Sequence, residues 1–215
     1  MTSPVQSSPA PARRRRKDAR PGEILDAALA EFSERGFGAS TLSGIARRAG
    51  VARPTIYLYF DDKDALFDAL MQRRLTDTLE EIRADLDGYT GDSGALLEML
   101  FTRMHADAAD PEAVTLLRVL IAEGRRFPKL VRLHHQRVMD VGVTLLQEIV
   151  ARGVTRGEFA PDAAEIDVRV LVAPVLMALF WRTVFWDVAP LDGEKILRDQ
   201  LRVVLRALGA RGPER

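Results

Sequence analysis

Hydrophobic side chains recur every three or four residues from about residue 24 onward, the spacing that places them on one face of a helix. Pro21 precedes the first such stretch and Gly36 follows it, the positions that proline and glycine favour at the start and the end of a helix. We therefore expect a first helix from Pro21 to Gly36, with Phe37 packed against its last turn. Its apolar face consists of Ile24, Leu25, Ala28, Leu29 and Phe32.

The same spacing continues after residue 62 and predicts a mainly helical chain. A long stripe ends at a glycine-rich break, residues 88–94, and later breaks contain Pro111, Pro128, Pro161 and Gly193. No stretch alternates between apolar and polar residues for long enough to indicate a strand. We expect an all-α fold of about nine helices, with a small head of three helices and a larger helical body.

Residues 41–60 have the pattern of two short helices joined by a tight turn. Ser40 or Thr41 can cap the first helix, and Gly50 permits a sharp turn with positive φ. This arrangement is typical of a helix-turn-helix, whose second helix enters the major groove of DNA. The residues expected to be buried between the helices are Ile45, Ala46, Ala49, Val51, Ile56 and Phe60.

The outer face of the second helix carries side chains that suit DNA. Arg53 and Thr55 lie nearest to the base edges, where an arginine can bind guanine through two hydrogen bonds. Tyr57 and Tyr59 suit phosphates. Lys63 opposes the dipole of the next helix, which makes it a poor structural choice but a good phosphate ligand. The predicted DNA-binding residues are Thr41, Arg47, Arg48, Arg53, Pro54, Thr55, Tyr57, Tyr59 and Lys63.

Charge is unevenly distributed, although the 215 residues have a formal net charge of zero. Residues 1–60 contain ten lysines and arginines against five acidic residues. A basic first part before an acidic remainder indicates a polyanion-binding head on a different body. Residues 1–17, which include the basic run Arg13–Lys17, are expected to form a disordered arm. The arm either contacts DNA without sequence preference or serves only for solubility.

The head resembles the DNA-binding domain of the tetracycline-repressor (TetR/AcrR) family over residues 18–78. Two residues depart from the family pattern: Gly44 replaces an acidic residue, which leaves a capping box half formed, and Ala52 replaces a capping serine. Both changes are expected to soften DNA binding without abolishing it. The matching residues are Ile24–Ala28, Phe32, Gly36, Phe37, Thr41, Ile45, Ala46, Ala49–Val51, Thr55–Phe60, Lys63 and Leu66.

That resemblance implies a transcriptional regulator, most simply a repressor, whose body at residues 79–215 binds a small molecule and forms a homodimer on a palindromic operator. Residues 116–130 are similar to the ligand domain of the AefR subgroup. We expect an apolar or aromatic effector that releases the DNA. Core packing explains each pocket candidate better when it is taken singly; the candidates are Phe101, Met104, His105, Arg118, Met177, Phe180, Trp181 and Phe185.

The last two helices are predicted to form the dimer interface. Residues 164–186 are apolar nearly all round, and a helix without a polar face must be buried on several sides. A monomer of this size has little else to cover this helix and the apolar face of the final one. We expect a four-helix interface between two copies. The alternative is that both helices pack within one chain.

Several kinds of site are not indicated. The absence of cysteine excludes disulfides and thiolate sites. His134 and His135 are adjacent, so on a helix they point about 100° apart and do not chelate together. We expect no metal and no cofactor. The longest apolar run, Val170–Trp181, is too short to span a bilayer, and no signal peptide is apparent; we expect a cytoplasmic protein without a membrane partner.

Two other classes of protein compete with a DNA-binding regulator. The first is a helical enzyme, which we do not expect because no phosphate-binding glycine loop, nucleophile elbow or paired catalytic carboxylates stand out. The second is a helical interaction protein whose head no longer binds DNA. Gly44 and Ala52 give this second class slight support.

Overall fold

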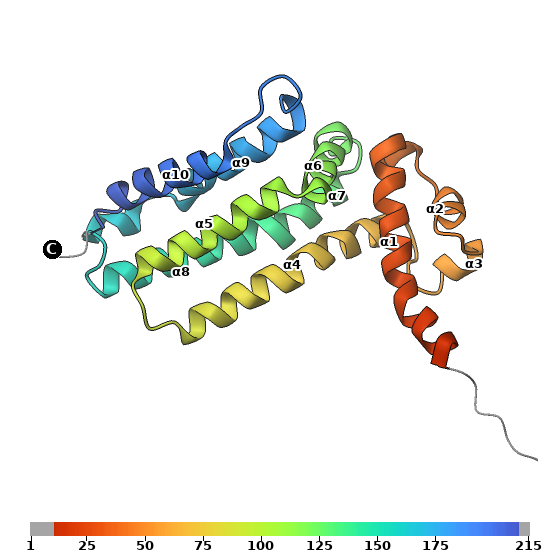
Figure 1. Ribbon diagram of the computed structural model, residues 1–215, viewed down its shortest axis with the longest axis horizontal. Helices are drawn as coiled ribbons and strands as arrows, with labels where there is room; N and C mark the ends of the chain where they lie inside the picture. Colours follow the sequence, from red (N-terminus) through yellow and green to blue (C-terminus); the bar gives the residue numbers. More distant parts are fainter. Residues whose placement is uncertain (1–10, 211–215) are drawn as a thin grey trace, which may run out of the picture. The chain divides into compact units, whose positions relative to one another are not determined.

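The computed structural model describes residues 11–210, without the side chains of residues 11–19, 74–82 and 84–87, and this part of the chain is all-α (Figure 1). The predicted fold class is confirmed. Because α7, the π-helical turn η1 and α8 follow one another directly, the ten described α-helices form nine continuous rods. The elements are α1 (Pro11–Ala39), α2 (Leu42–Arg48), α3 (Arg53–Ile56), α4 (Lys63–Gly88), α5 (Ser93–Ala109), α6 (Pro111–Glu123), α7 (Pro128–His134), η1 (His135–Met139), α8 (Asp140–Thr155), η2 (Pro161–Glu165), α9 (Val168–Val184) and α10 (Gly193–Ala207).

The chain divides into two compact units, residues 1–67 and 68–215. The first unit contains α1, α2, α3 and the start of α4, and the second contains the rest of α4 and everything after it. The division falls inside a continuous helix. The domain limits that we expect at residues 18 and 78 therefore stay predictions.

Helix α1 begins earlier than the sequence pattern indicates. It starts at Pro11 and runs through Pro21, so the prediction that Pro21 is the helix entry is wrong. Proline lacks one backbone donor, but the arginines, lysine and alanine before it are strong helix formers. Residues 1–10 of the predicted arm lie outside the described residues, and residues 11–17 are the first turns of α1.

Gly36 ends the regular part of α1, as predicted. Its φ of 74° and ψ of 160° belong to a region that is essentially reserved for glycine. The turn brings Phe37 back onto the helix, where its ring centroid lies 5.0 Å from that of Phe32 and 6.0 Å from that of Phe67. All three rings are fully buried. They form the centre of the first unit's core.

The core of the second unit lies among α5, α8, α9 and α10. Helix α5 packs against the other three, and α9 and α10 lie side by side (Figure 1). The fully buried side chains there include Leu97, Phe101 and Leu146. At the surface of this unit, an ion pair of 3.2 Å between Arg83 and Glu148 links α4 to α8. Within residues 11–210, no helix combines the length and the apolar character that crossing a bilayer requires.

The two last helices differ in what they leave uncovered. Most of the apolar face of α10 packs within its own chain, with Val204 and Leu208 buried and Leu197, Leu201 and Leu205 against the core. We expect a monomer to have little to cover this helix, but α5 and α9 pack against it within the chain. On α9 an apolar stripe stays exposed: Val170, Met177, Phe180 and Val184.

Two glycines of α8 are expected to respond to alanine in opposite ways. A Cβ at Gly153 would overlap the ring of Phe159, which is itself buried, whereas a Cβ at Gly142 would meet only Met104 at an ordinary 3.9 Å. Overpacking should make Gly153→Ala lower the free energy of unfolding by about 1–3 kcal/mol. Gly142→Ala should raise it by roughly 0.5–1 kcal/mol through helix propensity. Urea unfolding followed by circular dichroism measures both changes. If both variants raised, or both lowered, the free energy of unfolding, the packing described would be contradicted.

Candidate DNA interface and effector hollows

Residues 41–60 form the predicted helix-turn-helix. The hydroxyl of Thr41 accepts a hydrogen bond from the Gly44 amide at 3.0 Å and caps α2. The Ser40 hydroxyl instead donates to the Gly36 carbonyl at 2.6 Å. Thr41 is therefore the cap, and Ser40 ties the end of α1 to the start of the motif.

The turn between α2 and α3 has the predicted geometry. Gly50 has a φ of 65°, and the Val51 amide donates to the Ala46 carbonyl at 3.0 Å. Ile45 and Ile56 are completely buried between the helices, as the pattern indicates. The relative position of α2 and α3 is thus set by apolar packing and by one glycine turn.

Helix α3 is short, and its start is weakly capped. Ala52 stands at the N-cap without a side-chain hydrogen bond, as expected, and Pro54 occupies the first turn. Regular helix ends at Ile56, but the amide of Phe60 still donates to the Ile56 carbonyl at 2.9 Å. Residues 57–60 therefore continue as helical turns, with Tyr57 and Leu58 exposed and Phe60 buried.

An arginine–tyrosine pair dominates the exposed face of this segment. The Nη2 atom of Arg53 donates to the Tyr57 hydroxyl at 3.2 Å, and its guanidinium carbon lies 5.8 Å from the centre of that ring. Both residues are exposed. Sequence reasoning missed Leu58, which is 78% exposed beside them; an apolar residue between two tyrosines on a surface helix was the available signal.

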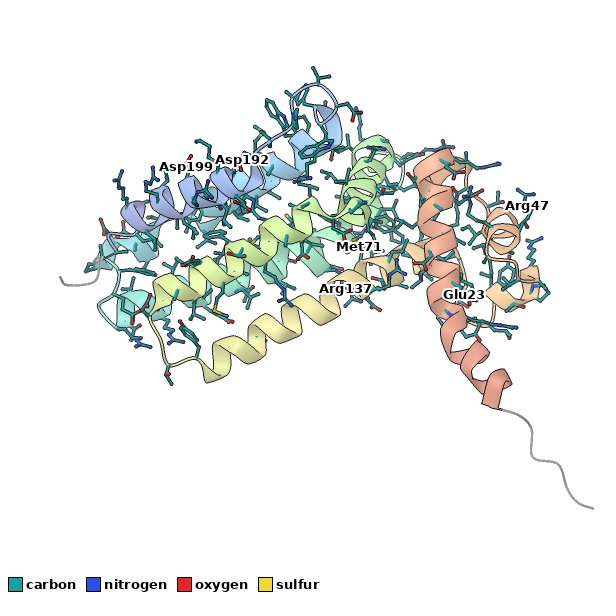
Figure 2. The ribbon with its side chains drawn as sticks, in the orientation of Figure 1. Glu23, Arg47, Met71, Arg137, Asp192 and Asp199 are labelled. Atoms are coloured by element: carbon teal, nitrogen blue, oxygen red, sulfur yellow. The ribbon has the colours of Figure 1, made fainter. Side chains whose placement is uncertain are left out.

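The two arginines of α2 have different surroundings. Arg48 donates to Glu34 at 2.8 Å and to Glu31 at 3.3 Å, and its hydrogen bond lowers the pKa of the Glu34 carboxyl. The guanidinium of Arg47 bonds to no other described residue, and Figure 2 shows it pointing away from α1. Arg47 is accordingly the better placed of the two for a phosphate.

Gly44 is explained by a buried carboxylate on α1. Glu31 is 3% exposed and forms ion pairs with Arg35 and Arg48, at 3.4 Å and 3.3 Å. A Cβ on residue 44 would lie 2.5 Å from the Glu31 Oε1 atom. The space where a side chain of residue 44 would begin is thus occupied from α1, which supplies an acidic group beside the first turn of α2.

Lys63 has a structural role that the sequence did not indicate. Its ammonium donates to the carbonyls of Phe37 and Gly38 at 2.7 Å and 3.3 Å, and it lies 4.8 Å from the centre of the Phe37 ring. The interpretation of Lys63 as a poor structural choice is therefore wrong, because its charge meets carbonyls in the last residues of α1, beyond Gly36, and not only the dipole of its own helix. Its contact with phosphate stays a prediction.

The eight predicted pocket residues have different surroundings in the structure. Phe101 is completely buried in the core, and Met104 packs against it. Met177, Phe180 and Phe185 are at least 40% exposed, and the Trp181 indole donates to the Ala189 carbonyl. The remaining two, His105 and Arg118, line the two hollows described next. The sequence shows that α9 is apolar nearly all round, so helical spacing did not indicate which of its side chains face the core.

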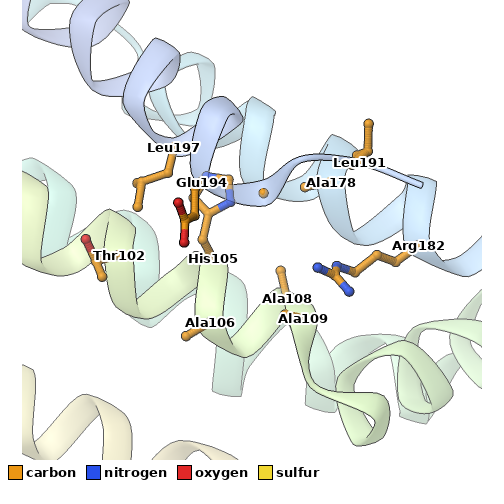
Figure 3. Close-up of a pocket in the computed structure, with 11 residues that line it drawn as sticks. Thr102, His105, Ala106, Ala108, Ala109, Ala178, Arg182, Leu191, Glu194 and Leu197 are labelled. Carbon is orange, nitrogen blue, oxygen red and sulfur yellow. The ribbon is translucent and has the colours of Figure 1, made fainter. Parts of the chain in front are cut away.

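Two neighbouring hollows are present in the second unit. The first, of about 230 Å³, lies between α5, α9 and the start of α10; Figure 3 shows Arg182 reaching from α9 toward Ala108 and Ala109. The second, of about 340 Å³, is lined by Arg118, Thr115 and Trp186 among others. Ala109 and Arg182 belong to both. Arg182 therefore stands where the two hollows meet.

The adjacent histidines have separate environments. Nδ1 of His135 lies 3.2 Å from Asp140, whereas Nδ1 of His134 is buried without a partner among the described residues. Burial lowers the pKa of His134 to about 4, with the neighbouring His135 as a smaller cause. No group of three or more potential metal ligands occurs among the residues that the structure describes.

His134 is expected to make the second unit sensitive to acid. In the unfolded chain the imidazole of His134 takes up a proton near pH 6.5, and in the folded chain only near pH 4. The contribution of neutral His134 to the free energy of unfolding is therefore fully present above pH 6.5 and is lost as the pH falls toward 4. The free energy of unfolding should drop by about 1 kcal/mol per pH unit in this range. Urea unfolding at pH 7 and pH 5 measures the slope. His134→Leu should flatten the slope and His135→Gln should keep it; the reverse result would refute the assignment.

The helix-turn-helix, its exposed arginine and the all-α body define a class, the helix-turn-helix transcriptional regulators. The family profile described as "Bacterial regulatory proteins, tetR family" matches residues 24–70, and "Tetracyclin repressor-like, C-terminal domain" matches residues 87–196. The chain belongs to the TetR family of bacterial transcriptional regulators. The resemblance of the head is therefore confirmed and extends to the body.

Individual relatives agree with this membership. The transcriptional repressor KstR2 of Rhodococcus jostii is 32% identical over 172 residues, which cover 77% of this chain and 80% of KstR2. YvdT of Bacillus subtilis is 42% identical over 66 residues, 31% of this chain and only 34% of that regulator. The structure of Bacillus subtilis FadR in complex with stearoyl-CoA has a TM-score of 0.63 at 20% identity and covers 86% of this chain and 98% of FadR.

Proposed function

We propose that this protein is a ligand-responsive repressor that binds a palindromic operator as a homodimer and is released by a small, largely apolar effector. The observation that carries the proposal is the exposed pair of Arg53 and Tyr57 on a segment fixed by buried apolar residues. The partner of Arg53 is an exposed tyrosine on the same surface, whereas Arg48 and Lys63 are bonded to other groups of the head. KstR2 is itself named a repressor.

The competing proposal of a degenerate head loses one of its two supports. Gly44 is no longer a defect, because the Glu31 carboxylate occupies the position beside it. Ala52 remains without a capping bond. A missing N-cap costs about 1 kcal/mol, which weakens a helix but does not remove a DNA-binding surface.

A mobility shift with the DNA upstream of the protein's own gene tests the function. Wild type should retard this DNA at low salt, and the affinity should fall steeply as salt rises because phosphate contacts release counterions. The double variant Arg53→Ala, Tyr57→Phe should retard it far less. If wild type gives no shift at low salt, or the double variant behaves like wild type, the protein is not an operator-binding regulator at this site.

The dimer is proposed to form chiefly through α9. Its exposed stripe recurs at helical spacing and is apolar throughout, whereas the outward side of α10 carries Lys195, Asp199 and Arg202 in ion pairs. Figure 2 shows Asp192 and Asp199 along that helix. An exposed apolar stripe on a helix is a self-complementary surface for a two-fold interface. This narrows the predicted four-helix interface to one with α9 at its centre and α10 at its polar edge.

A double substitution on the stripe is expected to give monomers. Met177→Glu together with Phe180→Glu buries four like charges in the proposed two-fold interface, which such an interface does not tolerate. Light scattering after size exclusion should change from twice the chain mass of 23.9 kDa to that mass. Val131→Glu, on a similarly exposed apolar residue of α7, is the matched control and should stay dimeric. A monomeric wild type at micromolar concentration would refute the dimer.

The effector is proposed to be a lipid-like or aromatic molecule. FadR, whose fold this chain shares, was solved with stearoyl-CoA, and alanine and leucine side chains make up about half of the lining of the first hollow. Release requires an effector that binds the DNA-incompetent form better than the DNA-bound form. A thermal-shift screen, repeated with operator DNA present, identifies such a molecule. The effector should raise the melting temperature of the free protein and should raise it less when operator DNA is present.

A further inference from the structure

Three helices place polar side chains at core-facing positions where they meet. On α9 the inward stripe consists of Leu171, Val175 and Ala178, all buried, and Arg182 continues it by one more turn. On α5 the inward position is His105, and on α10 it is Gln200, which is 4% exposed. Polar groups at such positions are costly unless they are satisfied. What each of them bonds to therefore matters.

His105 and Gln200 satisfy each other. The Gln200 Nε2 atom donates to the Leu171 carbonyl at 2.8 Å, and the Gln200 Oε1 atom lies 2.6 Å from Nε2 of His105. A carbonyl only accepts, so the amide nitrogen of Gln200 must face it, and the amide oxygen must then accept from His105. No fully buried nitrogen or oxygen atom of these two side chains is without a hydrogen-bond partner.

Arg182 is not satisfied in this way. Its guanidinium has no hydrogen bond or ion pair with any other residue that the structure describes, and the guanidinium carbon lies 4.1 Å from the centre of the Trp186 ring. The face of an aromatic ring attracts a cation but takes up none of its five N–H donors. A half-buried arginine with unused donors at the wall of two hollows is suited to an anion from outside the chain.

The other charges around the hollows do not supply that anion. The Glu194 side chain is 90% exposed and lies 3.5 Å from Arg198, so it belongs to the outer rim of the first hollow. Asp187 lines the second hollow but has no ion pair with Arg182. Arg118, across the second hollow, adds a further positive charge.

We infer that the meeting point of these hollows is the effector's head-group site, and that the effector is a small amphiphilic carboxylate. Arg182 binds the carboxylate through its planar fork, and the aliphatic chain lies against the alanine and leucine side chains of the 230 Å³ hollow. That volume is below the ~300–1,000 Å³ of sites for drug-sized ligands, so the chain is short. The inference rests on the proposed function, because it names the effector class of a ligand-responsive regulator.

Calorimetric titration of the full-length protein without DNA tests the site, with octanoate as the anionic probe and octan-1-ol as its neutral counterpart. Octanoate should bind saturably with a dissociation constant of about 1 mM or below. Octan-1-ol should bind at least about tenfold more weakly, because it offers no charge to the guanidinium. Equal affinities, or no saturable octanoate binding in this range, would overturn the inference.

A variant pair assigns the effect to Arg182. Arg182→Gln should weaken octanoate binding at least about tenfold and leave octan-1-ol unchanged, whereas Arg206→Gln, on an exposed arginine in the last turn of α10, should change neither. Unaltered octanoate binding by folded Arg182→Gln protein refutes the site. If this variant does not fold, the comparison of the two probes on wild type decides alone. Arg182→Gln should still retard operator DNA, so loss of the probe site is distinguishable from failure of the DNA-binding function.

Discussion

Replacing Arg53 with alanine is expected to lower the affinity for operator DNA by roughly a thousandfold. In the proposed homodimer, each of the two half-sites would lose a base contact of about 2 kcal/mol. Arg53 is exposed at the start of α3, the end of a recognition helix that lies nearest the bases. Fluorescence anisotropy with labelled operator at fixed salt measures the change. The variant should also discriminate less between the operator and unrelated DNA, because base contacts carry the sequence preference.

Arg47 and Arg206 provide the controls for this experiment. Arg47→Ala should weaken binding to all sequences alike and reduce the salt dependence by about one counterion per half-site, as expected for a phosphate contact. Arg206→Ala, in the last turn of α10, should leave affinity unchanged. A loss for Arg53→Ala that is equal on operator and random DNA would mean that Arg53 binds phosphate and reads no base.

Phe37→Ala is expected to abolish DNA binding by unfolding the head. The substitution removes a fully buried ring that contacts Phe32 and Phe67 and also the Lys63 ammonium, at a cost of about 3–5 kcal/mol. A unit of this size has little more stability than that to lose. Thermal unfolding followed by circular dichroism should show part of the helix signal lost at low temperature, with a later transition from the second unit.

Leu58→Ala is the matched control for stability. Leu58 lies in the same unit but is 78% exposed, so its removal should change the free energy of unfolding by no more than about 0.5 kcal/mol. Undiminished operator binding by Phe37→Ala at 37 °C would contradict the view that the three phenylalanines hold the head together.

The helices and the DNA-binding motif were predictable because their signals are local. Apolar spacing gave the helical class, and Gly36 and Gly50 marked positions where only a positive φ closes the turn. The sequence also indicated the cap at Thr41 and the burial of Ile45 and Ile56, because both depend on residues only a few positions away. These features depend on neighbours along the chain, so one sequence is sufficient to find them.

What the sequence did not predict depends on contacts between distant segments. Lys63 meets carbonyls 25 and 26 residues away, and Glu31 reaches Arg48 across 17. Nothing in the spacing of α9 indicated that Ala178 and Arg182 face inward while Met177 and Phe180 face outward, because the helix is apolar nearly all round. The pocket residues proposed on α9 therefore stay predictions, and the inward arginine was not among them.

The Glu31 carboxylate of α1, which lies beside the first turn of α2, limits how this head can be re-engineered. A designer who transplants residues 41–60 into another scaffold brings along Gly44 but leaves Glu31 behind, so the recipient acquires a void and a helix start without its acid. The reverse graft, which introduces a glutamate at position 44 here, brings a second carboxylate against the first. Residues 31, 44 and 48 should therefore be exchanged together, and substitutions meant to change the DNA sequence preference are best confined to residues 53–59.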